Sequence, residues 1–271
     1  MPDITTLIDD IYSLFDKPSE IDPEVVKAFG VRLGEMLAAR LTEQRNGTTL
    51  RLSNLGKPCL RQLWYECNTP ELGEKLSGST RLKFLVGDIL EHVVLFLAEV
   101  SGHTVEYQQQ EVDLDGVSGH IDALVDGELV DVKSASPYSF TKFQSGLKPE
   151  DDSFGYLTQL GGYAASLGHK RAHFLAAHKV LGTLCLDTHD LPEVDYAERV
   201  ATVRRTLEGN SPPDRGFDDV PDGKSGNRKL GVNCSYCAYK EFCWPGVKAY
   251  GYSNGVRFLT QVRKEPKVDA V

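Results

Sequence analysis

GHIDALVDGELVDVKSAS, residues 119–136, carries the clearest strand pattern in the chain. Its apolar and branched residues flank an Asp-Gly pair at 126–127, which predicts two strands, residues 117–126 and 128–134, joined by a tight turn. A third strand is expected just before them, at residues 104–114. We therefore expect consecutive strands at the centre of the fold.

Two aspartates of this stretch, Asp122 and Asp131, are candidate ligands for a divalent cation, because Mg²⁺ takes hard oxygen ligands. Lys133 follows Asp131 by two positions, so it projects from the same strand face. A lysine there can position a water molecule or stabilise negative charge during phosphodiester hydrolysis. Taken alone, the three residues are weak evidence, since a solvated acidic strand face has the same pattern.

A helix predicted at residues 156–167 adds two polar side chains. Gln159 and Tyr163 are four positions apart and therefore share one helix face. They follow Lys133 closely enough for this helix to pack beside the sheet. The alternative is structural, with Tyr163 half-buried in packing and Gln159 on the surface.

The regions around these segments favour helices and two further strands. The other expected helices are residues 3–15, 22–45, 80–100 and 193–208, and the further strands are residues 171–179 and 183–189. This order indicates an α/β fold with a mixed central β-sheet flanked by helices. We expect one integrated domain, with a helical region at 1–80, a core at 81–210 and a cysteine-bearing segment at 211–271.

Four of the six cysteines are spaced like a metal site. Three lie close together and one lies 175 residues before them: Cys234, Cys237, Cys243 and Cys59. Four thiolates suit either Zn²⁺ or an iron–sulfur cluster, and the single Cys-x-x-Cys pair favours [4Fe–4S] over zinc. Cys67 is an alternative fourth ligand, and Cys185 is expected to be a small buried strand residue.

Composition is ordinary for a soluble globular protein: 271 residues, 41% hydrophobic and 25% charged. The net charge of −9 argues mildly against nonspecific coating of nucleic acid, although basic residues cluster outside the acidic stretch 104–131. No apolar stretch is long enough to span a bilayer, and the acidic N-terminus does not resemble a signal peptide. The expected location is the cytoplasm, where thiols stay reduced.

Taken in order, these motifs resemble the RecB-like branch of the PD-(D/E)XK nuclease superfamily. Residues 119–122 are similar to its aspartate motif, residues 131–133 to its second motif and residues 159–163 to its last. The cysteine pattern is similar to the iron–sulfur members: CRISPR-associated RecB-like exonucleases, the AddB nuclease domain and related phage exonucleases. The resemblance spans residues 50–245 and implies a restriction-endonuclease-like core that hydrolyses DNA at ends or in single strands.

The resemblance also implies roles for individual residues. The ligands of Mg²⁺ or Mn²⁺ would be Glu91, Asp122, Asp131 and the backbone carbonyl of Val132. Lys133 would orient and activate water, while Gln159 and Tyr163 would arrange the active site and the substrate phosphate. Cys59, Cys234, Cys237 and Cys243 would hold a structural [4Fe–4S] cluster, with Zn²⁺ as the alternative occupant.

The helix expected at residues 80–100 has apolar residues at helical spacing, which predict its buried face: Leu82, Leu85, Val86, Ile89, Leu90, Val93 and Leu97. The family pattern places a metal ligand on this helix, four residues after a glycine. Glu91 has this register from Gly87 and is a hard oxygen ligand. His92, about 100° further around the helix, is the alternative ligand, or else a hydrogen-bonded, half-buried histidine.

Residues after Cys59 suggest contacts with DNA. Arg61, Trp64 and Tyr65 can guide a single strand by charge and stacking, and the alternative is that they pack around the cluster. Two other functions stay open: a non-catalytic DNA- or partner-binding module, and a subunit of a CRISPR-adaptation or recombination complex. No GxxxxGK[ST] motif is present, so the sequence provides no ATP-driven motor.

Overall fold

The computed structural model describes residues 3–17, 20–42, 48–191, 194–253 and 255–271. The chain forms two compact units. The first contains Met1–Arg45, Leu50–Gly56 and Leu76–Val200, and the second contains Asn46–Thr49, Lys57–Lys75 and Ala201–Val271. No helix in the described ranges is long and apolar enough to cross a membrane.

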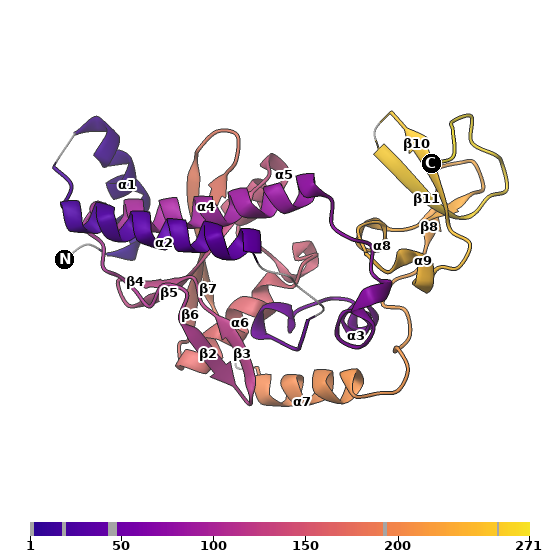
Figure 1. Cartoon of the computed structure of the whole chain (residues 1–271), viewed down its shortest axis with the longest axis horizontal. Coiled ribbons are helices and arrows are strands. Elements are labelled where there is room, and N and C mark those ends of the chain that lie inside the picture. The colour runs from indigo at the N-terminus through magenta and orange to yellow at the C-terminus, as the bar shows by residue number, and fades with distance from the viewer. Residues whose placement is uncertain (1–2, 18–19, 43–47, 192–193, 254) are drawn as a thin grey trace. The chain divides into compact units, whose positions relative to one another are not determined.

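The first unit is built on a five-stranded sheet with strand order β1-β4-β5-β6-β7 (Figure 1). Its strands are β1 (Val105–Glu106), β4 (Ala123–Val125), β5 (Glu128–Ala135), β6 (Arg171–His178) and β7 (Leu184–Asp190). β5 and β6 are parallel and the other neighbours are antiparallel. A parallel pair needs a crossover connection, which here contains α5 (Pro137–Gln144) and α6 (Tyr156–Leu167). The predicted mixed α/β class is confirmed.

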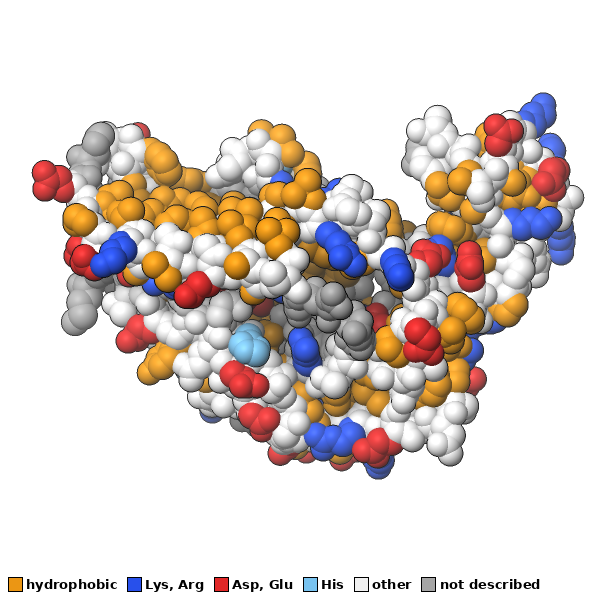
Figure 2. Space-filling view, viewed as in Figure 1, with side chains coloured by type: hydrophobic (Ala, Val, Ile, Leu, Met, Phe, Trp, Pro, Cys, Tyr) orange, Lys and Arg blue, Asp and Glu red, His pale blue; other side chains and the backbone are white. Residues whose placement is uncertain are grey.

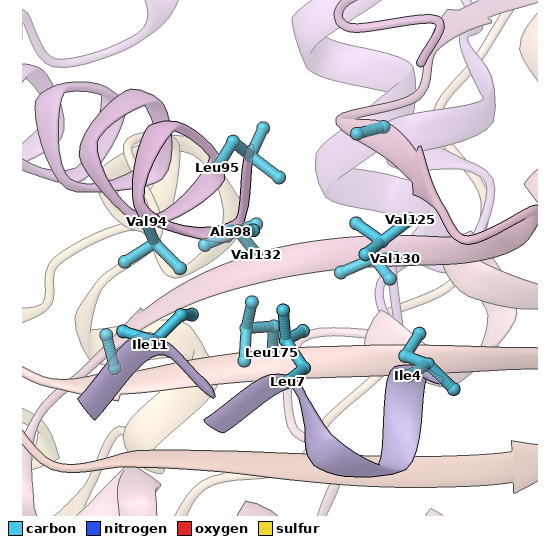
Figure 3. Close-up of a cluster of buried hydrophobic side chains, with 12 residues drawn as sticks. Ile4, Leu7, Ile11, Val94, Leu95, Ala98, Val125, Val130, Val132 and Leu175 are labelled. Carbon is cyan, nitrogen blue, oxygen red and sulfur yellow. The ribbon is translucent and has the colours of Figure 1, made fainter. Parts of the chain in front are cut away.

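Helices cover one face of this sheet with a continuous apolar cluster (Figure 3). The helices are η1 (Ile4–Thr6), α1 (Leu7–Asp16) and α4 (Gly78–Val100). The buried members are Ile4, Leu7, Ile11, Val94, Leu95, Ala98, Ala123, Val125, Val130, Val132, Leu175 and Ala177. Because side chains alternate along a strand, Val130 and Val132 face these helices while Asp131 and Lys133 point to the opposite face.

The buried face of α4 differs from the predicted stripe. Leu82 is 59% exposed and Val86 is 48% exposed, whereas Val94 and Leu95 are buried. The reason is that only the C-terminal half of α4 packs into the cluster on the sheet. The prediction was wrong for the first half, because helical spacing gives a face but not the length of helix that is covered.

Helix α2 (Pro23–Thr42) packs on α4 through one aromatic stack and two ion pairs, and it buries no residue. Phe29 stacks on Phe96 with ring centroids 4.4 Å apart. The ion pairs are Arg32–Glu99 at 3.3 Å and Arg40–Asp88 at 2.7 Å. Figure 2 shows an apolar band over this helix. The last residues of the helix expected at 22–45 lie outside the described residues.

Two of the expected strands are broken. The segments 104–114 and 117–126 each divide between the main sheet and a separate two-stranded sheet. The separate sheet consists of β2 (Glu111–Leu114) and β3 (Val117–His120). Tyr107 and Gln109 have φ angles of 54° and 56°, a left-handed conformation that interrupts an extended strand. Asp122 falls between β3 and β4 and need not follow strand alternation.

Both ends of α6 are formed by glycines in the left-handed conformation, Gly155 with φ 79° and Gly168 with φ 72°. Asp152 caps the first turn, because its carboxylate accepts hydrogen bonds from the backbone N–H groups of residues 154–157. Gly155 packs against the backbone of Gly56, where a Cβ atom on Gly155 would overlap the Gly56 carbonyl. This contact determines where α6 begins.

The second unit has a four-stranded antiparallel sheet, with order β10-β11-β9-β8, and several short helices. Its elements are α3 (Leu60–Asn68), η3 (Pro70–Leu72), β8 (Val220–Pro221), β9 (Arg228–Lys229), α8 (Val232–Ser235), α9 (Lys240–Cys243), β10 (Lys248–Tyr252) and β11 (Gly255–Gln261). Its core is aromatic, with Trp64, Tyr65 and Tyr239 buried together. The chain also forms η2 (Leu52–Asn54), η4 (Pro149–Asp151) and α7 (Tyr196–Leu207).

The contact at the start of α6 can be tested with two alanine variants. Gly155→Ala should destabilise the protein more than Gly168→Ala, by more than about 1 kcal/mol in urea-induced unfolding. Both changes place alanine at a positive φ, but the Cβ overlaps backbone only at Gly155, whereas Gly168 faces open space. Equal losses of stability would contradict the close approach of Gly155 and Gly56.

Candidate active site and cysteine site

Three acidic side chains come together in the first unit from three different elements. Glu91 lies on α4, Asp122 lies between β3 and β4, and Asp131 lies on β5. They are close enough to alter one another's ionisation. The structure thus brings together carboxylates that are up to 40 residues apart in the sequence.

Two of these carboxylates accept short hydrogen bonds. Glu91 Oε1 accepts one from Gln109 Nε2 at 2.6 Å. Asp122 Oδ2 accepts one from the backbone N–H of Val132 at 2.7 Å, which ties the break between β3 and β4 to the middle of β5. Gln109, which has the left-handed conformation, therefore supplies a side-chain hydrogen bond to the site.

Burial and mutual repulsion make these acids hard to ionise. Burial, followed by the nearby charge of Asp131, raises the pKa of Glu91 to about 7. Burial and the charges of Glu91 and Asp131 raise the pKa of Asp122 well above its usual range. A cation bound among these carboxylates would relieve both effects.

Lys133 lies beside Asp131 on the same face of β5, and its ammonium group pairs with Asp131 Oδ2. Burial lowers the pKa of Lys133, but the charges of Asp131 and Asp122 outweigh burial and raise the pKa above its usual value. The lysine therefore stays protonated. Its ammonium also lies over the ring of Tyr156, 4.8 Å from the centroid.

Helix α6 brings Gln159 and Tyr163 to the same region. Gln159 Nε2 donates a long hydrogen bond of 3.5 Å to Tyr163 Oη. Tyr163 is buried, and burial together with the Asp131 charge raises its pKa to about 12, so its hydroxyl stays protonated. Gly119 packs against this ring, where an added Cβ would lie 2.6 Å from Tyr163 Cε1. The close approach requires glycine at this position of the GHID sequence.

A cleft of about 710 Å³ within the first unit leads to these residues. Its lining includes three arginines and site residues: Arg32, Arg40, Arg51, Glu91, Asp122 and Tyr163. Arg32 and Arg40 come from α2 and are ion-paired with carboxylates of α4. The cleft thus has basic side chains on one wall and the acidic cluster on another.

The carboxylates suit a hard divalent cation, although within the described ranges no three His, Cys, Asp or Glu side chains are arranged as a finished ligand set. Each carboxylate is instead held by its own partner. Asp131 Oδ2 is buried and is in close contact with the ammonium group of Lys133.

The helical residue beside Glu91 has a different environment. His92 Nδ1 lies 3.0 Å from the backbone carbonyl of Asp88, one turn earlier in α4. His92 lines the cleft, as Glu91 does. The choice of Glu91 over His92 as the metal ligand stays a prediction.

A second candidate site lies in the second unit. One pocket is lined by four thiols: Cys59, Cys234, Cys237 and Cys243. Burial raises the pKa values of Cys234 and Cys237, the latter to about 11, and neighbouring thiols contribute to both. Sulfur donors of this kind suit Zn²⁺ or an iron–sulfur cluster. Like the carboxylates, the described thiols are not closed into a finished ligand set.

The other two cysteines have different positions. Of the described cysteines, Cys59 and not Cys67 lines the pocket, so the geometry favours Cys59 as the fourth ligand. Cys185 lies on β7 in the first unit, where burial raises its pKa to about 11. All six thiols are free, so no disulfide joins them.

The residues after Cys59 lie inside the second unit. Trp64 and Tyr65 are each 8% exposed, and Trp64 Nε1 donates a hydrogen bond to the Gly209 carbonyl at 2.8 Å. Arg61 Nη1 donates to the Pro213 carbonyl at 2.6 Å. These positions support the packing alternative, and they leave the two rings unable to stack on bases as predicted.

Two residues that the sequence did not indicate belong to the first site. Gln109 lies in a segment that was expected to be regular strand, and no local pattern points to its contact with Glu91. Tyr156 precedes Gln159 by three positions and so lies near the same helix face. That spacing was the available signal for Tyr156.

Neither a protein-family model nor a curated protein matches this sequence. The chain is similar to two crystal structures of the alkaline exonuclease LHK-Exo from Laribacter hongkongensis, the second in complex with dAMP. Their TM-scores are 0.43 and 0.42, both at 16% identity, covering 65% of this chain and 92% and 94% of theirs. It is also similar to the crystal structure of SSO0001, with a TM-score of 0.45, 17% identity and coverage of 78% of this chain and 93% of that chain.

Crowding at Glu91 predicts a pH-dependent stability. The pKa of Glu91 is about 7 in the folded protein, above its ordinary value of 4.5. The free energy of unfolding should therefore fall as pH rises from 4.5 through 7, because Glu91 ionises less readily in the folded state than in the unfolded state. Glu91→Gln removes this loss. In EDTA at pH 8 the variant should be more stable than wild type in urea-induced unfolding, by on the order of 2 kcal/mol.

Below pH 4.5 the difference should disappear, because Glu91 is then protonated in both states. Glu111→Gln, a change at an exposed carboxylate on β2, is the matched control and should alter neither measurement. Equal free energies of unfolding for wild type and Glu91→Gln at pH 8 would show that the folded protein does not disfavour the ionised form of Glu91.

Proposed function

We propose that this chain is a divalent-metal-dependent DNA exonuclease. The observation that supports the proposal is the meeting of Glu91, Asp122 and Asp131 with Lys133 near a large cleft. Asp131 is buried, and Glu91 and Asp122 are half-buried. These three acids with one lysine leave excess negative charge, which a cation would balance. A binding module has no need of such a cluster.

The residues that would hold Mg²⁺ or Mn²⁺ are Glu91, Asp122, Asp131 and the backbone carbonyl of Val132. When bound, the cation would neutralise charge on the scissile phosphate and acidify an attacking water. The raised pKa values of Glu91 and Asp122 support this assignment, because burial first and the neighbouring carboxylates second disfavour their charged forms, and a bound cation would favour them.

The remaining site residues have roles that follow from their protonation and contacts. Lys133 stays protonated, so it would orient a water molecule or stabilise charge on the phosphate rather than accept a proton. Tyr163 keeps its hydroxyl proton and would donate it in a hydrogen bond to a phosphate oxygen. Gln159 holds the Tyr163 hydroxyl and would help to position it.

The proposed substrate is DNA with a free end or in a single strand. The cleft, with a volume of about 710 Å³, is within the range of ordinary ligand pockets, roughly 300–1,000 Å³, and could receive part of such a strand. Arg51 lines the cleft and is exposed, so it would contact the phosphate backbone. Arg32 and Arg40 would add positive charge on the wall formed by α2.

For the second unit, we propose a structural [4Fe–4S] cluster held by Cys59, Cys234, Cys237 and Cys243. The pocket that these thiols line lies next to the aromatic core of the unit. Such a cluster would join the segment around α3 to the segment around α8 and α9, so its binding would contribute directly to folding. Zn²⁺ is the alternative occupant.

Degradation of end-labelled DNA tests the first proposal. With Mg²⁺ or Mn²⁺, wild-type protein should shorten single-stranded DNA from an end, and EDTA should stop the reaction. Asp122→Asn and Lys133→Ala should each lower the rate by at least about 100-fold, because each loses a charge at the reacting phosphate. Thermal melts should show that both variants remain folded.

Glu111→Gln is again the control, since it removes a carboxylate outside the site, and it should degrade DNA at the wild-type rate. DNA that is bound but never shortened, with every tested cation, would favour the non-catalytic binding module. Full activity in either site variant would refute the residue assignments.

Anaerobic purification tests the cluster. The wild-type protein should be brown and carry about four irons per chain. Cys59→Ala should lose iron and become sensitive to protease after residue 201, whereas Cys185→Ala and Cys67→Ala should retain it. Colourless protein with one zinc ion would refute the iron assignment, and full iron loading in Cys59→Ala would refute the ligand set.

A further inference from the structure

The ammonium group of Lys133 has two kinds of partner. On one side it pairs with Asp131 Oδ2, and on the other it faces aromatic rings. The ring centroid of Tyr156 is 4.8 Å from Lys133 Nζ, and that of Phe174 is 5.9 Å away. The lysine side chain is 17% exposed, and a cation over an aromatic face is held more strongly when water is excluded.

The ring of Tyr156 is held in place by its neighbours. It stacks on the ring of Phe143 with ring centroids 6.2 Å apart, and its centroid lies 5.4 Å from that of Phe154. Its backbone N–H donates a hydrogen bond of 2.9 Å to Asp152, the cap of α6. The rings of Phe143 and Phe154 therefore restrict rotation of the Tyr156 ring away from Lys133.

Asp131 is required twice in the proposed site. It balances Lys133 in this structure, and it is also a proposed ligand of the cation. If the Asp131 carboxylate binds a cation, Lys133 must share this nearest counter-charge with the cation. The aromatic face is a partner that cation binding does not remove.

We propose that Tyr156 is a positioning residue, whose ring face keeps the Lys133 ammonium at the reacting phosphate when Asp131 binds the cation. The inference rests on the proposed nuclease function. It requires the face of the ring and not its hydroxyl, so phenylalanine should replace tyrosine and an aliphatic residue should not.

Kinetics of DNA degradation test this requirement. Tyr156→Leu should lower kcat about tenfold with KM unchanged, while Tyr156→Phe should keep kcat within about twofold of wild type. Mono-, di- and trifluorophenylalanine at position 156 have nearly the same shape but a progressively weaker ring face. They should lower kcat in that order, which a purely structural role would not do.

A spectroscopic measurement tests the contact without relying on activity. In ¹³C-lysine-labelled protein, the ε-methylene protons of Lys133 should be shifted upfield by the Tyr156 ring, both in EDTA and with Mg²⁺. The shift should persist in Tyr156→Phe and be lost in Tyr156→Leu. Tyr138→Leu is the matched control, because Tyr138 is an exposed ring with Lys142 5.0 Å from its centroid, and it should change neither kcat nor this shift.

The outcomes separate the two proposals. If wild-type protein degrades no DNA, the function fails, and the Lys133 shift still shows whether the ring holds the lysine. If wild type is active and the fluorinated series retains full kcat, the positioning role is wrong while the function stands. A large loss of kcat in Tyr156→Phe would also overturn the positioning role of the ring, because it would show that the reaction requires the Tyr156 hydroxyl.

Discussion

Repulsion among three acidic side chains that lie close together in the first unit is the constraint around which the site is built. Glu91, Asp122 and Asp131 repel one another, and burial removes the water that would screen them. The fold compensates with an amide, a backbone N–H and one ammonium group. This compensation is incomplete, which is consistent with the raised pKa values of Glu91 and Asp122 and suits the site to a cation.

Strand β5 serves the core and the site at once. Its alternation sends Val130 and Val132 into the apolar cluster beneath α1 and α4, while Asp131 and Lys133 point to the opposite face. The site therefore rests on the most buried strand pair of the sheet, β5 and β6. A rigid support of this kind is what precise placement of a lysine and its carboxylate requires.

The second unit follows a different principle, because its core is small and aromatic. Trp64, Tyr65 and Tyr239 are buried together near α3, and four thiols line the adjoining pocket. Small cores often need a metal or a disulfide for stability. All six thiols are free, and the metal centre proposed above would supply this stability.

The sequence by itself determined the mixed sheet, the helix that carries Gln159 and Tyr163, and the identity of Asp122, Asp131 and Lys133 as the acidic and basic residues to examine. Strand and helix periodicity and short-range spacing carry that information. Only the tertiary structure decided which residues share a surface. The left-handed Tyr107 and Gln109 interrupt the expected strand 104–114, and the expected strand 117–126 is interrupted where Asp122 lies, between β3 and β4. Packing, rather than periodicity, left Leu82 exposed and buried Trp64, and it placed Tyr156 over Lys133. These features depend on contacts between residues far apart in the chain, which no local pattern encodes.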